Sequence, residues 1–235
     1  MHLSYEFREV IAELIFAEPK MIGLSLHTTN LSFCKEIVKQ VKSVLPETLI
    51  VVGGYDCMRP DQGRYLFPEY DYMVVFEAEN TLGSLVEQLV KGERPKNIPG
   101  ILSKYDNDAF PFIRAPLVDD LDNIDFPTYE WTDINLYRNW NGYQLTPIVL
   151  TRGCRWSICT FCAERFPWRI RSASNLVDEI EWLASKGCTI FHFNDSDLSG
   201  DPAVVREVCE EIIRRDLQGL SFVGQLRVQK RYSQE

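Results

Sequence analysis

The chain has 235 residues, of which 45% are hydrophobic and 25% charged, and its formal net charge is −9. These totals describe an ordinary globular chain of one or two domains and exclude a disordered one. An acidic chain gains nothing from releasing counterions on DNA or RNA, so we expect no nucleic-acid partner. No apolar stretch is long enough to span a bilayer, and the N-terminus lacks a signal-peptide pattern. The sequence therefore predicts a cytoplasmic protein with no membrane span.

The first half alternates helical and strand patterns. Apolar stripes predict helices over 5–17 and 31–44, and Asn80 is the predicted N-cap of a third. Short apolar runs predict four strands, the last at an edge of the sheet: 20–26, 48–54, 71–77 and 98–104. Such alternation favours a parallel, doubly wound sheet, which binds ligands at the carboxyl ends of its strands.

Residues 105–145 lack periodicity and are interpreted as a connector between domains. The alternation then resumes, with strands predicted over 145–151, 189–195 and 220–228. A helix is predicted over 175–186, and a second is opened by Asp201 as N-cap and Pro202 at its first position. Three strand–helix steps are too few to close a barrel, so we expect the chain to be part of something longer.

The chain has seven cysteines, an odd number, and no secretion signal. Both observations argue against a disulfide framework and indicate that the thiols are reduced. Among them, Cys34, Cys188 and Cys209 have apolar neighbours and are predicted to be small buried side chains.

The remaining pattern of interest is "RGCRWSICTFC", in which Cys154, Cys159 and Cys162 follow a predicted strand. Thiolates at this spacing converge on one metal ion or cluster. A structural zinc site needs a fourth ligand, and the nearest candidates, Cys188 and His192, lie some thirty residues away. Three ligands favour an iron–sulfur cluster with one open iron, while a zinc-stabilised interaction domain remains the alternative.

This loop resembles the cluster loop of radical S-adenosylmethionine (SAM) enzymes, with Phe161 in the place of the family's aromatic residue. The family usually has three residues between the first two cysteines, whereas this chain has four. The resemblance implies that Phe161 and the ends of the next two strands contact SAM. Those strand-end residues are Asp195, Ser196, Gln225 and Arg227, and for the last two a solvent-facing role is an equal alternative.

The first half resembles the cobalamin-binding domain that precedes the barrel in one branch of this family, through "IGLSLHTTN" and "IVVGGYD". The resemblance implies that four residues lie against cobalamin: Ser25, Thr28, Gly53 and Gly54. His27 is a possible cobalt ligand, but a satisfied polar residue at a strand end is the favoured interpretation. The segment "FEAEN" departs from the family's acidic, glycine-rich loop.

Together these resemblances imply an α/β chain built from a partial flavodoxin-like, doubly wound cobalamin-binding domain (1–104), a connector (105–145) and a partial radical SAM (β/α) barrel (146–235). The front of the first domain and the back of the barrel are expected to be missing. The implied cofactors are a 4Fe–4S cluster, SAM and cobalamin (vitamin B12). The implied activity is reductive cleavage of SAM to a 5′-deoxyadenosyl radical, for methylation by a methyltransferase or for cyclisation or rearrangement. Implied partners are a small-molecule or peptide substrate and an electron donor such as flavodoxin or ferredoxin. A non-catalytic remnant that binds cluster or cobalamin is the second hypothesis.

Overall fold

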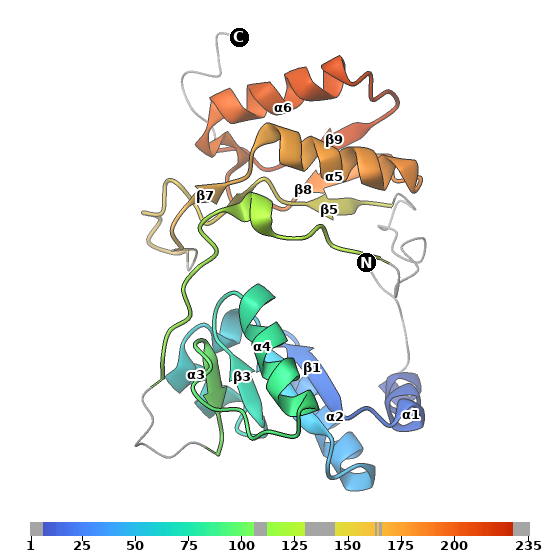
Figure 1. Ribbon diagram of the computed structural model, residues 1–235, viewed down its shortest axis with the longest axis vertical. Helices are drawn as coiled ribbons and strands as arrows, with labels where there is room; N and C mark the ends of the chain where they lie inside the picture. Colours follow the sequence, from blue (N-terminus) through green and yellow to red (C-terminus); the bar gives the residue numbers. More distant parts are fainter. Residues whose placement is uncertain (1–6, 106–111, 130–143, 163, 165, 228–235) are drawn as a thin grey trace. The chain divides into compact units, whose positions relative to one another are not determined.

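The computed structural model describes residues 7–105, 112–129, 144–162, 164 and 166–227 (Figure 1). The chain divides into two compact units, an N-terminal unit that ends at Val118 and a C-terminal unit that begins at Asp119. Each unit has its own sheet and its own hydrophobic core, so each is described separately. No helix among these residues is both long and apolar enough to cross a membrane.

The N-terminal unit is built on a four-stranded sheet in the order β1-β2-β3-β4. Its strands are β1 (Met21–Ser25), β2 (Leu49–Gly53), β3 (Tyr72–Val74) and β4 (Ile101–Ser103). The first three strands are parallel, with Ile22 opposite Ile50 and Val52 opposite Met73. β4 occupies an edge, as predicted, but it runs antiparallel to β3, which corrects the expectation of a wholly parallel sheet.

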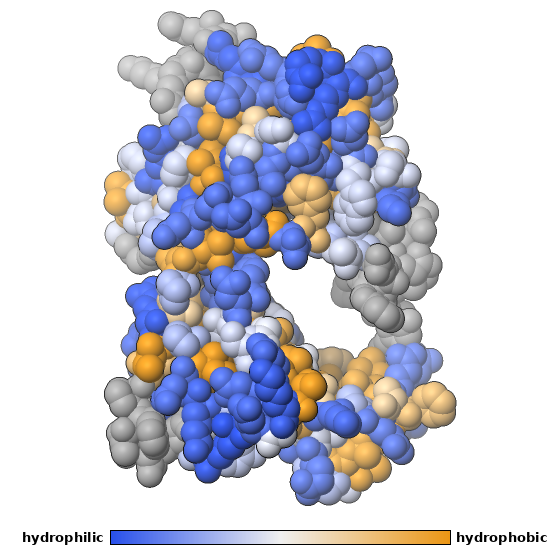
Figure 2. All heavy atoms as spheres, in the orientation of Figure 1, coloured by the Kyte–Doolittle hydropathy of each residue, from blue (hydrophilic) through white to orange (hydrophobic). Residues whose placement is uncertain are grey.

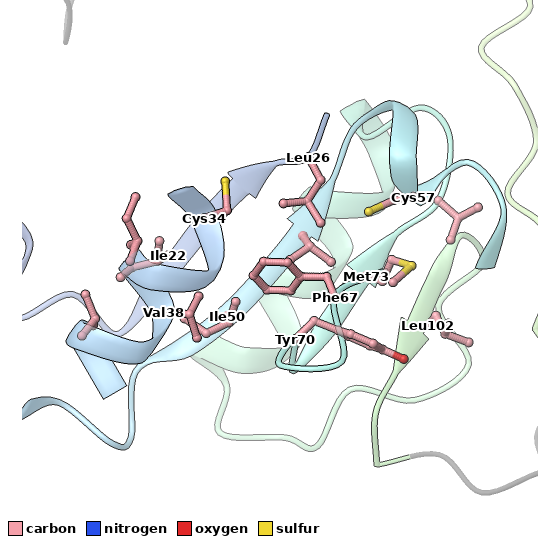
Figure 3. Packing of buried hydrophobic residues seen from close by; sticks show 14 residues of the cluster. Ile22, Leu26, Cys34, Val38, Ile50, Cys57, Phe67, Tyr70, Met73 and Leu102 are labelled. Atoms are coloured by element: carbon pink, nitrogen blue, oxygen red, sulfur yellow. The ribbon is translucent and has the colours of Figure 1, made fainter. Parts of the chain in front are cut away.

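Both faces of this sheet are buried, as expected of a doubly wound fold. Ile50 and Met73 point into one core with α2 (Leu31–Val44) (Figure 3). Val52 belongs to the same core, and α1 (Phe7–Ala17) packs against it. The alternate residues Val51 and Tyr72 face a second core beneath α4 (Glu79–Val90). The period of two along each strand therefore assigns neighbouring side chains to opposite layers.

Most of the helices and strands predicted in this half are confirmed, and the corrections concern local detail. The predicted N-cap Asn80 is wrong, because α4 begins at Glu79 with Ala78 as its cap and without a side-chain capping bond. The sequence patterns also missed a short 3₁₀ helix, η1 (Tyr55–Cys57), and α3 (Pro60–Leu66).

A buried carboxylate, Asp71, connects the strands of this unit. Asp71 accepts hydrogen bonds from the Ile50 backbone N–H (2.7 Å) and the Tyr105 hydroxyl (2.6 Å), and it pairs with Lys104 and Lys42. Burial disfavours its charge, but these hydrogen bonds and cations outweigh burial and hold the pKa of Asp71 below its ordinary value.

The C-terminal unit contains a parallel sheet in the order β5-β8-β9, formed by β5 (Thr146–Ile148), β8 (Ile190–Phe193) and β9 (Ser221–Val223). The helices α5 (Ala173–Ser185) and α6 (Pro202–Arg214) pack side by side over this sheet (Figure 1). Two short 3₁₀ helices, η2 (Leu121–Asn123) and η4 (Leu198–Gly200), complete the unit's helices within the described residues. The predicted start of α6 is confirmed, since the Asp201 carboxylate accepts from the Ala203 N–H at 3.1 Å and Pro202 is the first helical residue.

Burial of the cysteines outside the loop matches the prediction at two positions and contradicts it at the third. Cys34 and Cys188 are buried, whereas Cys209 is exposed on α6. The outward-facing side of α6 is hydrophilic (Figure 2). Cys209 instead lines an open pocket with Val208 of α6 and Phe222 of β9. Its neighbours are therefore apolar, as the sequence indicates, but they leave the thiol exposed.

Two parts of the predicted connector are described, and each packs on one unit. The Gly100 N–H donates to the Ile113 carbonyl, and the Val118 N–H donates to Glu77, within the N-terminal unit. Asp122 accepts from the Ser172 N–H in the C-terminal unit. The proposed limits of the connector at 105 and 145 stay a prediction.

Candidate functional site

The carboxyl ends of the three parallel strands meet at one edge of the N-terminal sheet, and four predicted residues lie there. Ser25 ends β1, Gly53 ends β2, and Gly54 follows it. Thr28 lies in the loop after β1, where its hydroxyl donates to Asp56 at 3.2 Å. Ser25 and Thr28 are both exposed residues at this edge of the sheet.

Gly54 is required by the chain's own backbone. Its φ of 93° lies in the left-handed region, and a Cβ there would stand 2.8–2.9 Å from the Leu26 backbone and the Ser25 hydroxyl. At Gly53 a Cβ would meet only Val74, at an ordinary 3.7 Å. Gly54 therefore allows the loops after β1 and β2 to touch, which brings Ser25 beside the Gly–Gly turn.

The loop after β1 is held by Asn30, a residue that the sequence patterns did not single out. The Asn30 side chain accepts from the His27 N–H and donates to the Ser25 carbonyl, each at 2.9 Å. The exposed His27 ring lies 5.1 Å from that of Tyr55, centre to centre. His27 thus has an aromatic neighbour and a backbone bond, as expected of a satisfied residue at a strand end. The small, hydroxyl-bearing surface between these loops fits a large planar cofactor with polar substituents.

The cysteine loop leaves one two-stranded ribbon and returns to it. β6 (Thr151–Arg152) pairs with β7 (Arg169–Ile170) in antiparallel fashion. Gly153, with φ of 80°, opens the loop where a Cβ would lie 2.6 Å from the Phe166 carbonyl oxygen, so only glycine lets the two ends approach this closely. The ribbon thereby fixes the base of the loop.

The three predicted thiols, those of Cys154, Cys159 and Cys162, are half-buried in this loop. The Cys162 N–H donates to the Cys159 carbonyl at 3.3 Å, and the Glu164 N–H donates to the Cys162 sulfur at 3.4 Å. In the described part of the chain, no three His, Cys, Asp or Glu side chains are already gathered as a metal site. Chemically, three thiols on one loop fit three irons of a cluster. Binding would have to draw the sulfurs together.

The two candidates for a fourth zinc ligand lie in the sheet of the C-terminal unit and its core. Cys188 is 2% exposed and packs in the core of the C-terminal unit. His192 lies within β8, between Pro147 of β5 and Val223 of β9. The predicted SAM contact Phe161 is, by contrast, 92% exposed on the loop. An exposed aromatic ring beside the thiols is free to cover a bound group.

Asp195, a predicted SAM contact, is 3% exposed and fully engaged with the backbone. Its carboxylate accepts from the Leu150 N–H (3.2 Å), the Thr151 N–H (2.5 Å) and the Thr151 hydroxyl (2.6 Å). Burial raises the pKa of Asp195, and these bonds and the charge of Arg171 oppose that rise only in part. Asp195 therefore joins β8 to the junction of β5 and β6, directly before the cysteine loop.

The other predicted SAM contacts divide between exposed and paired residues. Ser196 and Gln225 are exposed at the ends of β8 and β9, where their side chains face solvent. Arg227 donates through Nε to Asp197 at 3.2 Å. Burial disfavours the Asp197 charge, but bonds from Ser199 and Arg227 outweigh it and lower the pKa of Asp197.

Comparison with known proteins agrees with this geometry. The family model for the B12 binding domain matches residues 3–86, the segment that carries β1, β2, β3 and the glycine turn. The chain is 26% identical over 218 residues to an anaerobic magnesium-protoporphyrin IX monomethyl ester cyclase from Synechocystis sp., covering 88% of this chain and 42% of that protein. It is 25% identical over 171 residues to an uncharacterised methyltransferase from Pyrococcus horikoshii, covering 71% of this chain and 37% of that one.

Solved structures show the same fold. OxsB, a cobalamin-dependent S-adenosylmethionine radical enzyme with aqua-cobalamin and S-adenosylmethionine bound, superposes with a TM-score of 0.72 at 20% identity, covering 93% of this chain and 32% of that one. The radical S-adenosylmethionine methyltransferase TsrM from Kitasatospora setae gives 0.67 at 19% identity, covering 90% and 44%.

The fold and its strand-end site define the N-terminal unit as a B12-binding domain. Beyond this segment the chain is distantly similar in sequence to the cyclase and the methyltransferase, and it shares its fold with the two cobalamin- or S-adenosylmethionine-dependent radical enzymes. The chain spans less than half the length of each relative described above.

Proposed function

We propose that this chain takes part in cobalamin-dependent radical SAM chemistry, with a 4Fe–4S cluster at Cys154, Cys159 and Cys162. The observation that carries the proposal is the union of two features in one chain. A B12-binding domain occupies residues 3–86, and a loop with three thiols leaves the β6–β7 ribbon, shortly after β5 of a second parallel sheet. Each feature alone has other uses, and their occurrence in one chain supports this chemistry.

The donor set supports a cluster in preference to zinc. A structural zinc ion needs four protein ligands, and the buried Cys188 is not free to leave the core and supply one. Three thiolates can hold three irons and leave the fourth for the amino and carboxylate groups of SAM. When bound, the cluster supplies the electron that cleaves SAM to a 5′-deoxyadenosyl radical. The protein holds the irons through its thiolates and can shield them with the exposed Phe161 ring.

For cobalamin, the supporting feature is the carboxyl edge of the N-terminal sheet. Ser25 and Thr28 offer exposed hydroxyls, and Gly53 carries no side chain there. These residues would bind the polar substituents of the corrin and let it approach the backbone. The contact of the His27 ring with Tyr55 supports a role for His27 as a satisfied polar residue at the strand end in preference to a cobalt ligand.

The class of reaction we propose is methylation or ring closure at an unactivated carbon. This proposal is supported by the chain's similarity to two relatives, a cyclase and a methyltransferase. The β5-β8-β9 sheet with α5 and α6 would be the first part of the (β/α) barrel that encloses the radical. A small molecule or peptide would be the substrate, and flavodoxin or ferredoxin the electron donor.

Anaerobic reconstitution with iron and sulfide tests the cluster. We expect a brown protein with about four irons per chain, the content of a 4Fe–4S cluster. A variant in which all three loop cysteines are alanine should stay colourless, whereas Cys209→Ala, which removes an exposed thiol outside the loop, should load normally. Stoichiometric zinc, or equal iron uptake by both variants, would overturn the assignment.

Reduction of the loaded protein in the presence of SAM separates an enzyme from a remnant. Formation of 5′-deoxyadenosine, detected by mass spectrometry, is the expected result. Cluster uptake without this product would favour the non-catalytic alternative.

Retention of hydroxocobalamin through gel filtration tests the second cofactor. Ser25→Leu places a bulky side chain at the end of β1 and should abolish retention. Ser43→Leu, an exposed change near the far end of α2, is the matched control and should retain the cofactor. Equal retention by the two variants would exclude this edge as the binding site.

A further inference from the structure

Two consecutive residues of the cysteine loop, Arg155 and Trp156, contact groups outside the loop. Arg155 donates to the Gly200 carbonyl at 2.7 Å and lies 3.3 Å from the Asp201 carboxylate. Its guanidinium carbon also lies 5.0 Å from the centre of the Trp168 ring. Asp201 is the N-cap of α6, so Arg155 binds the loop to the start of that helix.

The second contact joins the loop to the segment that follows β9. The Arg227 guanidinium lies 4.2 Å over the Trp156 ring, within the range of a cation–π interaction. The same guanidinium pairs with Asp197 at 3.2 Å, and the Arg227 N–H donates to that carboxylate at 3.3 Å. Because Asp197 is 4% exposed and is also held by Ser199, it gives Arg227 a fixed position.

We propose that Arg155 and Arg227 are positioning residues that anchor the segment between Cys154 and Cys159, so that less of the loop has to become ordered when a cluster draws the sulfurs together. The proposal rests on the proposed function above. It gives Arg227 a role through Trp156 in place of a contact with SAM. Both anchored residues lie in the interval between the first two cysteines.

The physical reason is the entropy of the loop. A loop that becomes ordered when it binds a ligand pays a cost in conformational entropy, and this cost weakens the affinity. Contacts that order the loop before binding reduce that cost. Arg155 is 55% exposed and its ion pair alone is weak, but its bond to the Gly200 carbonyl fixes its direction. The two arginines hold neighbouring residues to different elements, so neither can substitute for the other.

The experiment compares Arg155→Ala and Arg227→Ala with Arg155→Lys and Arg227→Lys. Arg214→Ala is the matched control, because Arg214 is an exposed arginine of α6 that pairs only locally, with Glu211. In the metal-free chain, alkylation by iodoacetamide is followed at each cysteine by mass spectrometry after chymotryptic digestion. Loss of either anchor should raise the alkylation rate of Cys154 about threefold and leave the alkylation rate of Cys209 unchanged. A change of about threefold corresponds to the free energy of one half-exposed, charged hydrogen bond.

In the reconstituted protein, the rate of iron loss to a chelator is the second measurement. We expect it to rise about three- to tenfold in the alanine variants, with partial rescue by lysine, which keeps the charge but not the planar stack. Circular dichroism of the metal-free variants should match the wild type, which separates positioning of the loop from a general loss of fold.

The outcomes are distinguishable. If the wild type takes up no iron–sulfur cluster, the proposed function is wrong, and the alkylation rates still decide whether the anchors order the loop. If the wild type loads but both alanine variants behave as Arg214→Ala in both measurements, the loop is not held by these arginines. Full rescue by Arg227→Lys would refute the role of Arg227 stacking on Trp156, because lysine keeps the charge without the planar stack.

Discussion

Replacing Asp195 by alanine removes the acceptor of three hydrogen bonds in the core of the C-terminal unit. Two of the donors are the backbone N–H groups of Leu150 and Thr151, which are 1% and 3% exposed and have no route to water. Because each of the two buried backbone donors left unsatisfied costs about 1–3 kcal/mol, and the Thr151 hydroxyl can turn elsewhere, we expect a loss of about 2–6 kcal/mol. Asp195→Asn keeps one acceptor oxygen and should cost about 1–2 kcal/mol.

The assay is urea denaturation followed by tryptophan fluorescence. All five tryptophans lie at or after residue 131 in the sequence, so this signal reports on the C-terminal unit alone. Ser196→Ala, a change at the exposed neighbouring residue, should alter the free energy of unfolding by less than about 0.5 kcal/mol.

A different ordering of these variants would refute the reasoning. If Asp195→Ala unfolds at the wild-type midpoint but no longer binds SAM, the carboxylate serves the cofactor and not the backbone. If the asparagine variant is as unstable as the alanine variant, the cost comes from the lost charge and not from the unsatisfied donors.

Two further predictions concern the N-terminal unit. Since the folded-state pKa of Asp71 is lowered, its stabilisation is present above its unfolded pKa and is lost as pH falls below about 4. Asp71→Asn should therefore cost about 2–3 kcal/mol at pH 7 and much less at pH 3, by urea titration in circular dichroism, and an equal cost at both pH values would contradict this account. Gly54→Ala forces an L-residue into the left-handed region against the Leu26 backbone and should cost at least about 2 kcal/mol, with loss of hydroxocobalamin retention. Gly23→Ala, where a Cβ meets nothing within 4 Å, is its control in the same denaturation and gel-filtration measurements and should behave as wild type.

Much of the fold could be predicted because its signals are local. The stripe of α1, the apolar run of β2 and the Asp201–Pro202 start of α6 each depend on residues within one or two turns or one strand. The errors have the same origin. At Asn80 a good capping residue lies one position inside the helix, and at Cys209 the apolar residues around the thiol form an open pocket that leaves it exposed.

The candidate site was predictable in its residue types and less so in their roles. The three loop cysteines and the residues Ser25, Thr28, Gly53 and Gly54 were found from spacing and resemblance, and the last four do gather at one edge. Asp195 was expected to face a cofactor, yet it binds backbone groups more than 40 residues earlier in the chain. Its partners Leu150 and Thr151 carry no side-chain signal for such a bond, because a backbone N–H is common to nearly every residue.

The sequence by itself determined the alternation of helices and strands, the strand-end positions of the small residues and the three-thiol loop, since these follow from short-range periodicity and spacing. Only the tertiary structure decided that β4 runs antiparallel, that Asp195 stabilises the junction before the loop, and that Arg155 and Arg227 bind the loop to α6 and β9. Those features depend on which distant residues meet when apolar faces are buried together, and neither propensity nor spacing records such meetings.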